Sequence, residues 1–379
     1  MNISYPTNSN KITKDKRVNL YFTASPLQNL VAKTILETFE KGSHNILLPY
    51  KQTAVANPNN IDSQEWDDYL FIPWPRFHPL PGPFGKLRRL QQNLASVSAR
   101  IPTNCNEIIM HSAVFDTEAT NYFISYLKRA HPHARFHARL LPDGIISTRR
   151  YPQSTFQIAL KCIRKLRILI DPNLRYTCYK GDRCGSDAAF VNKIYILNGF
   201  PHEYDANKVI ELPPLVERSS IPSTTKPRAL VLGQPLAGNN LLTHSHMIKL
   251  ADAIRHWLKN QGVSEIYYKG HPKDPNLELF HQDYILVDST EPVEKHIASH
   301  FYSHIVGVRS TALITAVQLY KNETKVVSYG LDLVSFKNEA EKSSMIHTFK
   351  TLGIDILPYS PPPTSSMSPP QDQQTAKHT

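Results

Sequence analysis

The sequence predicts an α/β protein built from two halves, each with its own parallel sheet, and three observations support this fold class. Short apolar runs alternate with segments of helical length, and strands separated by helices form parallel βα units. This alternation stops after residue 150 and restarts at residue 228. The chain, at 379 residues, is also too long for one ordinary hydrophobic core. We therefore expect two α/β domains that face a cleft.

The first half carries the first set of alternating elements. Apolar runs predict strands at residues 18–22, 44–50, 69–74, 107–111 and 135–141. Helical periodicity predicts helices between them at residues 26–40, 86–99 and 117–130. Residues 151–215 are expected to be irregular apart from one basic helix at 155–170.

The second half repeats the alternation more regularly. Strands are expected at residues 228–234, 265–270, 284–289, 304–308 and 324–330, and helices at 243–260, 293–300 and 310–319. The predicted organisation is a first domain over residues 1–217, a linker over 218–227, a second domain over 228–357 and a disordered Pro/Ser/Gln-rich tail over 358–379.

Composition excludes several classes of protein. No run of about 18 apolar residues occurs, so no membrane span is expected. The start of the chain lacks the apolar core of a signal peptide, and its four cysteines form no CxxC pair, which favours a cytoplasmic protein with reduced thiols and no zinc site. A formal charge of +11 favours an acidic partner, such as a phosphate ligand, an anionic membrane or nucleic acid.

Polar residues that follow the predicted strands mark a candidate site, because ligands of parallel sheets bind beyond the carboxyl ends of strands. His271 stands at such an end between Gly270 and Pro272, with Lys269 and Lys273 on either side. An imidazole titrates near neutral pH and can act as an acid. A histidine that only caps a strand would give the same pattern.

Three further strand ends have a functional and a purely structural interpretation. Ser310 and Thr311 begin a predicted helix, where hydroxyls and backbone N–H groups can hold a phosphate or form a plain N-cap. Gly233 and Gln234 could allow a ligand close to the backbone or form a tight turn. Asp143 is an isolated acid in a basic stretch and could be a general base or part of an Asp-Gly turn.

Six motifs occur in order along the chain: SPLQ (25–28), PDG (142–144), LGQPL (232–236), YYKGHP (267–272), TEPVE (290–294) and VRSTAL (308–313). In this order they resemble motifs of the bacterial sialyltransferases, above all the lipooligosaccharide sialyltransferases and the capsule polysialyltransferases. The resemblance extends over residues ~18–330. It implies a GT-B fold of two Rossmann-like domains, and inverting, metal-independent transfer of sialic acid from CMP-sialic acid with no cofactor. The implied acceptor is a lipooligosaccharide, O-antigen or capsular polysialic acid.

The resemblance also implies roles for individual residues. Asp143 matches the aspartate that deprotonates the acceptor, and His271 matches the histidine that acts on the CMP phosphate. The family usually has a second acid where this chain has Pro142. If the aspartate is the base, Asp143 remains to act; if the first acid were the base, the assignment would fail. The residues assigned to the CMP donor are Gly233, Gln234, Lys269, Pro272, Glu294, Ser310 and Thr311, and those on the acceptor side are Ser25 and Gln28.

Two alternatives to this function remain at the level of sequence. One is a transferase for another nonulosonic acid, and the other is a non-enzymatic basic protein that binds nucleic acid. The second lacks a recognition motif or interleaved aromatic residues in its basic stretch, so no nucleic-acid partner is expected.

The basic helix at residues 155–170 has two interpretations of its own. Residues 149–183 are rich in bases and could contact an anionic membrane at the inner face of the bacterial membrane. Alternatively, the helix could cover a core with Ala159, Cys162, Ile163 and Leu166 inward, and hold Lys161, Arg164 and Lys165 in solvent.

Overall fold

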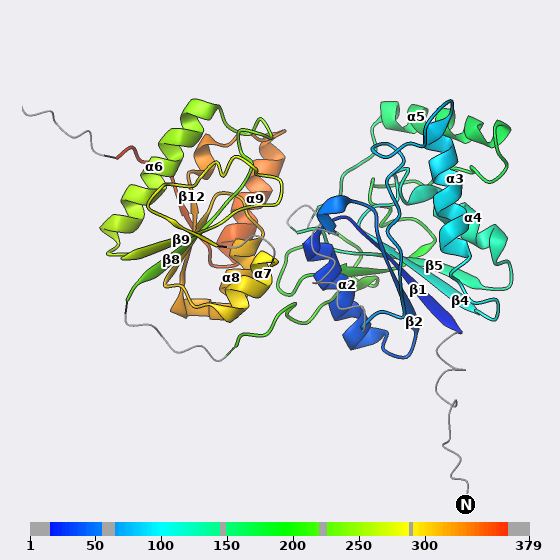
Figure 1. Cartoon of the computed structure of the whole chain (residues 1–379), viewed down its shortest axis with the longest axis horizontal. Coiled ribbons are helices and arrows are strands. Elements are labelled where there is room, and N and C mark those ends of the chain that lie inside the picture. Colours follow the sequence, from blue (N-terminus) through cyan, green and yellow to red (C-terminus); the bar gives the residue numbers. More distant parts are fainter. Residues whose placement is uncertain (1–15, 55–64, 145–148, 220–225, 288–290, 363–379) are drawn as a thin grey trace, which may run out of the picture.

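The computed structural model describes residues 16–54, 65–144, 149–219, 226–287 and 291–362. Their strands form two sheets, one from residues 17–211 and one from residues 228–357 (Figure 1). Most of the predicted linker and tail, and residues 288–290 at the end of the strand predicted at 284–289, lie outside the described residues. The predicted domain boundaries stay predictions.

The first sheet has the order β3-β2-β1-β4-β5-β6-β7, and each neighbouring pair is parallel. Its strands are β1 (Arg17–Thr23), β2 (His44–Pro49), β3 (Asp68–Tyr69), β4 (Glu107–Ser112), β5 (Arg135–Leu140), β6 (Val191–Ile196) and β7 (Val209–Glu211). The helices are α2 (Pro26–Phe39), α3 (Gly85–Ser98), α4 (Asn121–Ala130) and α5 (Thr155–Lys165), with 3-10 turns η1 (Gln52–Ala54) and η4 (Leu166–Leu169).

Helices cover both faces of this sheet, which explains the apolar runs in its central strands. In β1, Tyr21 belongs to the same buried cluster as Val31 and Ile35 of α2. Leu20 and Phe22 point the other way, into a cluster with residues of α3 and α4. Because successive side chains alternate between faces, β1 is buried on both.

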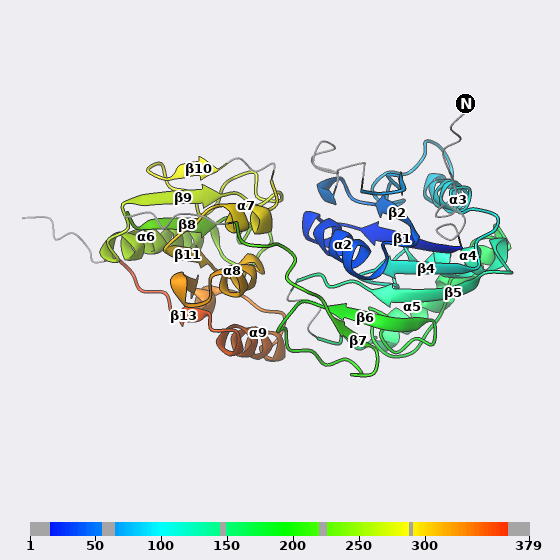
Figure 2. The same ribbon diagram turned by 90° about the horizontal axis from the view of Figure 1, so that it is seen from below.

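The second sheet has the order β10-β9-β8-β11-β12-β13 and is also parallel throughout. Its strands are β8 (Arg228–Leu232), β9 (Glu265–Lys269), β10 (Ile285–Val287), β11 (His304–Gly307), β12 (Lys325–Tyr329) and β13 (Asp355–Leu357). The helices are α6 (His244–Asn260), α7 (Val293–Ser299), α8 (Ala312–Tyr320) and α9 (Glu339–Thr351), with 3-10 turns η5 (Lys321–Glu323) and η6 (Leu331–Leu333). Figure 2 shows α2 of the first half facing α7 and α8 of the second.

The predicted fold class of two facing α/β units is confirmed, with local corrections. Residues 151–215 are not irregular throughout, because β6 and β7 extend the first sheet there. The strand predicted at 69–74 shrinks to β3, since Pro73 and Pro75 cannot donate to a ladder. Helix α9 and strand β13 were not predicted. None of the helices in the described part of the chain is long and apolar enough to cross a membrane.

The orientation predicted for the basic helix as a cover over a core is wrong. Lys161 of α5 is buried, and its ammonium lies over the ring of Tyr179, 4.6 Å from the ring centre. Ile163 and Leu166, expected inward, are instead exposed. The reason is a set of tyrosines and backbone carbonyls beneath the helix that bind its basic side chains, so the polar side of the helix packs against the sheet domain.

Candidate active site

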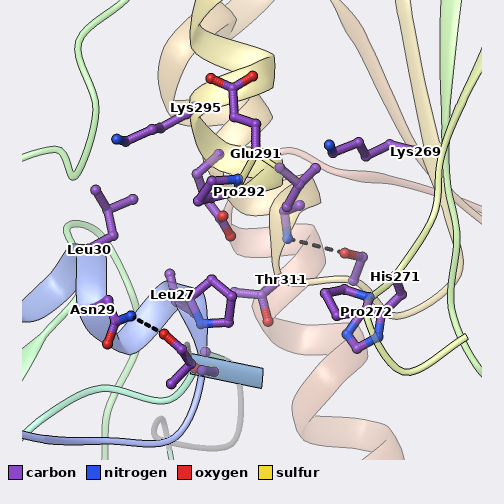
Figure 3. Close-up of a pocket in the computed structure, with 18 of the residues that line it drawn as sticks. Leu27, Asn29, Leu30, Lys269, His271, Pro272, Glu291, Pro292, Lys295 and Thr311 are labelled. Carbon is purple, nitrogen blue, oxygen red and sulfur yellow. Dashed lines mark hydrogen bonds between the residues drawn. The ribbon is translucent and has the colours of Figure 1, made fainter. Parts of the chain in front are cut away.

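A cavity of about 440 Å³ lies at the carboxyl ends of strands from both sheets (Figure 3). The first half contributes the start of α2, residues near η1 and the turn after β5. The second contributes the loops after β8, β9 and β11 and the start of α7. All of the predicted site residues line this cavity except Gln28. This volume falls in the range of small-molecule sites, which run from about 300 to 1,000 Å³.

Asp143 lies on the turn after β5, where the two halves touch. The next residue, Gly144, has a φ of +65°, a conformation that favours glycine. A Cβ atom on Gly144 would lie only 2.5 Å from Oγ1 of Thr311 in the second half. Glycine is therefore required both by the turn and by the close approach of Thr311, and the contact holds Asp143 beside the Ser310–Thr311 turn.

His271 lies just beyond β9 and has a fixed ring orientation. The backbone N–H of Lys273 donates to Nδ1 of His271 over 3.0 Å. In the neutral ring the proton must then be on Nε2. Burial by the walls of the cleft, helped by the positive charge of Lys273, lowers the pKa of His271 below its usual value of 6.5. Although the side chain is exposed to the cleft, the surrounding protein still disfavours its charged form.

Two lysines from opposite halves interact beside these residues. Desolvation lowers the pKa of Lys51, Lys273 lowers it further, and Asp143 opposes this shift. Lys51, which also lies 5.1 Å above the ring of Trp74, is thus within electrostatic range of both a cation and an acid of the site. The sequence reasoning missed Lys51, although it follows β2 and the same strand-end argument would have found it.

The Ser310–Thr311 turn leads from β11 into α8. Oγ of Ser310 accepts a hydrogen bond from the N–H of Ala312 over 3.3 Å, and Thr311 makes no side-chain cap. Ser310 therefore provides part of the cap, while the first turn of α8 opens toward the cavity, which Ala312 lines. Such a helix start favours an anion.

Gln234 and Gly233, in the loop after β8, stabilise the structure around the cavity. Oε1 of Gln234 accepts from the N–H groups of Val308 and Arg309, over 3.1 and 2.9 Å, and so ties the loop after β8 to the loop after β11. A Cβ on Gly233 would lie 2.5 Å from the hydroxyl of Tyr268. Packing against β9 thus explains the glycine, and its predicted contact with the donor stays a prediction.

Lys269 and Glu294 are both buried and both line the cavity. Burial raises the pKa of the Glu294 carboxyl, while its backbone N–H and the charge of Lys269 oppose the shift. Figure 3 shows Lys269 along one side of the site with Glu291 and Pro292, which precede α7, and Lys295 of α7, while His271 and Pro272 lie nearer Thr311. A carboxylate and an ammonium at this wall can bind hydroxyl groups of a ligand.

The acceptor-side predictions differ in placement. Ser25 lines the cavity and caps α2, since its Oγ accepts from the N–H of Gln28 over 3.3 Å. Gln28 is only 1% exposed, and its Oε1 accepts from the N–H of Ala24 over 2.7 Å. Its side chain therefore stabilises the turn between β1 and α2, and any contact with an acceptor stays a prediction. Within the described residues, no three His, Cys, Asp or Glu side chains come together as a metal site.

Comparison with known proteins finds a family model that matches part of the chain, and solved structures that share its fold. The family model for alpha-2,8-polysialyltransferases matches residues 185–329, which include His271, Ser310 and Thr311 but not Asp143. A sialyltransferase from Photobacterium damsela is 11% identical, with a TM-score of 0.52 over 91% of this chain and 81% of that one. Arabidopsis thaliana UGT89C1 complexed with UDP-L-rhamnose is also 11% identical, with a TM-score of 0.50 over 91% of this chain and 85% of that one. No curated protein matches the sequence. The fold shared with these structures is GT-B, as predicted.

Proposed function

We propose that the chain is a bacterial sialyltransferase, and that it transfers sialic acid from CMP-sialic acid to a cell-surface glycan, with inversion and without a metal ion. The match of residues 185–329 to the alpha-2,8-polysialyltransferase family model supports this proposal. The proposed acceptor is a lipooligosaccharide, an O-antigen or a capsular polysialic acid. One observation carries the proposal: Asp143 from the first half and His271 from the second line the same cavity.

The proposed reaction is a single displacement. Asp143 accepts the proton of the acceptor hydroxyl as its oxygen bonds to the anomeric carbon of sialic acid. The bond from that carbon to the CMP phosphate oxygen breaks, and its electron pair leaves with CMP. His271 donates a hydrogen bond or a proton to the phosphate, and the Ser310–Thr311 turn stabilises its charge. Attack from the face opposite the leaving group inverts the anomeric centre.

Electrostatics supports an anionic donor. CMP-sialic acid has a phosphate and a carboxylate, and Lys51, Lys269 and Lys273 contribute positive charge at or beside the cavity. In the empty cleft, burial and Lys273 lower the pKa of His271. A bound phosphate would oppose both effects and favour the protonated ring. His271 would thus become an acid when the donor is present.

The test is a transfer assay with defined products. The purified full chain is incubated with CMP-sialic acid and a panel of galactosides and sialosides, and products are identified by mass spectrometry. Parallel reactions with CMP-activated legionaminic and pseudaminic acids determine the sugar. A product that contains sialic acid is expected. Transfer of another nonulosonic acid alone would correct the donor, and no product from any donor would contradict the proposed function.

A further inference from the structure

Helix α5 and turn η4 carry an unusual set of exposed apolar side chains. The described part of the chain has 13 large apolar side chains that are exposed, and seven lie between residues 156 and 170. These seven, which we call the α5–η4 face, are Phe156, Ile158, Leu160, Ile163, Leu166, Leu169 and Ile170. Soluble proteins rarely expose so many contiguous apolar residues without a partner. In Figure 1, α5 lies at the upper outer edge of the first half, away from α7 and α8.

The basic side of the helix is fixed against the protein, so the apolar face cannot simply turn inward. Arg164 donates to the carbonyl of Asp116 over 3.1 Å and to the hydroxyl of Tyr176 over 3.3 Å. Arg167 donates to the hydroxyl of Tyr122 over 2.9 Å and forms an ion pair of 2.7 Å with Glu118. Lys161 is buried, only 4% exposed. Rotating α5 would break these contacts and leave the carbonyl of Asp116 and the carboxylate of Glu118 without these donors.

The charge around this face is mainly positive, although Asp171 directly follows Ile170. Residues 155–170 contain no acidic residue. Lys165 on α5 is exposed, as are Arg175 and Arg129. Arg129 lies beside the segment that follows η4, since its guanidinium donates to the carbonyl of Asn173 over 3.3 Å. An apolar face beside exposed bases complements an anionic lipid surface. Two copies of this chain joined by the same face would instead bring like charges together, which disfavours a dimer.

We propose that the α5–η4 face docks the protein on a bilayer that contains anionic phospholipid. The apolar side chains enter the boundary between headgroups and acyl chains, while Lys165, Arg129 and Arg175 remain at the headgroups. Both contributions matter, but insertion of apolar side chains is the larger, because most of the basic side chains of α5 are bound to the protein. Vesicle binding needs neither donor nor acceptor, so its failure would leave the proposed transfer reaction untouched.

The test measures sedimentation of the full chain with vesicles of phosphatidylcholine and phosphatidylglycerol, and with vesicles of phosphatidylcholine alone. The variant Ile163→Ser, Leu166→Ser, Leu169→Ser should lower binding to the anionic vesicles by about tenfold or more. The control, Ile248→Ser, Ile285→Ser, Leu286→Ser, removes three exposed apolar side chains in the second half and should bind like wild type. Equal thermal unfolding temperatures establish that both variants are folded.

Salt separates insertion from purely electrostatic binding. At about 1 M salt charges are screened over about 3 Å, yet wild type should keep part of its binding, whereas binding by charge alone would be lost. The proposal is overturned if the α5–η4 variant binds vesicles like the control, or if wild type does not bind anionic vesicles. It is also overturned if light scattering shows a wild-type dimer that the α5–η4 variant converts to a monomer without any vesicle binding, because a second copy would then cover the face.

Discussion

The two halves of the molecule hold their site residues in different ways on similar parallel sheets. In the second half, the turns after β8, β9 and β11 are bound to one another: the N–H of Gly233 donates to the carbonyl of Lys269 over 2.8 Å, and Gln234 binds the loop after β11. In the first half, the turns after β1 and β2 are also joined, by a hydrogen bond of 2.9 Å from the N–H of Tyr50 to the carbonyl of Thr23, but Asp143 comes from the turn after β5, where the first half meets Thr311 of the second. Three loops braced together suit a constant ligand such as a nucleotide, and a base on a turn at the junction of the halves suits acceptors of varied shape. The predictions below test this division of tasks.

The largest effect is expected for the acid in the braced half. His271→Ala should reduce turnover by about 10²–10⁴, the usual scale for the loss of an acid catalyst. Affinity for the donor should change much less, because the phosphate turn at Ser310 is intact. Steady-state kinetics with CMP-sialic acid measures both quantities. Turnover near that of wild type would remove His271 from the mechanism.

Replacing the proposed base of the first half, Asp143, should affect transfer to the acceptor much more than hydrolysis of the donor. Asp143→Asn should lose most transfer, again by about 10²–10⁴, while slow hydrolysis of the donor continues because it needs the acid and the phosphate site but no activation of an acceptor. Release of CMP is followed with and without acceptor. Normal transfer by this variant would place the base elsewhere and would make the Pro142 departure from the family pattern significant.

Gly233 tests whether the frame of the second half depends on packing. Gly233→Ala should destabilise the fold by about 1–3 kcal/mol through overpacking, because the new methyl group meets the hydroxyl of Tyr268. Tyr268→Phe removes that hydroxyl and should restore part of the lost stability in the double variant. Denaturant unfolding of the two single variants and the double variant measures the coupling. Additive losses would show that the two side chains do not meet.

A buried histidine beneath the braced half predicts a loss of stability in acid. Burial, aided by His300 and Lys269, lowers the pKa of His296 from 6.5 to about 4. Its ring also stacks on His300, lies 3.7 Å from Glu291 and contacts the Tyr302 hydroxyl at 2.8 Å. Since the folded pKa is below the unfolded value, this contribution to stability is complete above pH 6.5 and is lost as the pH falls toward about 4.

His296→Gln removes this titration and should reduce the loss of unfolding free energy between neutral pH and pH ~4.5. The exposed His347→Gln serves as the control and should behave like wild type. Denaturant unfolding at the two pH values gives the comparison. Equal acid losses in wild type and both variants would mean that other buried groups dominate.

The smallest expected effect is that of a chelator. The proposed mechanism stabilises the leaving phosphate with His271 and the start of α8, so EDTA should leave the transfer rate unchanged. Assays with and without added Mg²⁺ or Mn²⁺ measure this. Complete loss with EDTA that either ion restores would contradict the metal-independent mechanism.

The general fold and most of the site could be predicted from the sequence because both follow from strand periodicity. Parallel strands end at one edge of a sheet, so Asp143, His271 and Ser310 could be expected to meet there without knowledge of the loops. Strands β6 and β7 escaped prediction because no helix of ordinary length separates them, and β7 has only three residues.

Features that depend on distant partners could not be predicted in this way. The sequence of α5 defines a basic and an apolar face but does not indicate which one packs against the protein. The basic face packs inward because its side chains bind three tyrosines outside the helix: Tyr122, Tyr176 and Tyr179. The sequence allows a ligand or a tight turn as the reason for glycine at position 233, and only the structure adds the close approach of a tyrosine on the neighbouring strand. Gln28 was placed in the site by its motif, although its side chain binds the local backbone.

The division between a donor half and an acceptor half is tested most directly by titration calorimetry of CMP. Two variants are compared with wild type: Ser310→Ala with Thr311→Val, which removes both hydroxyls and keeps the shape of Thr311, and Asp143→Asn. Hydrogen bonds to charged groups contribute about 1.5–3 kcal/mol each, so the hydroxyl variant should bind CMP about tenfold or more weakly, and Asp143→Asn should bind it like wild type. A CMP affinity that falls in Asp143→Asn and is unchanged in the hydroxyl variant would contradict the account.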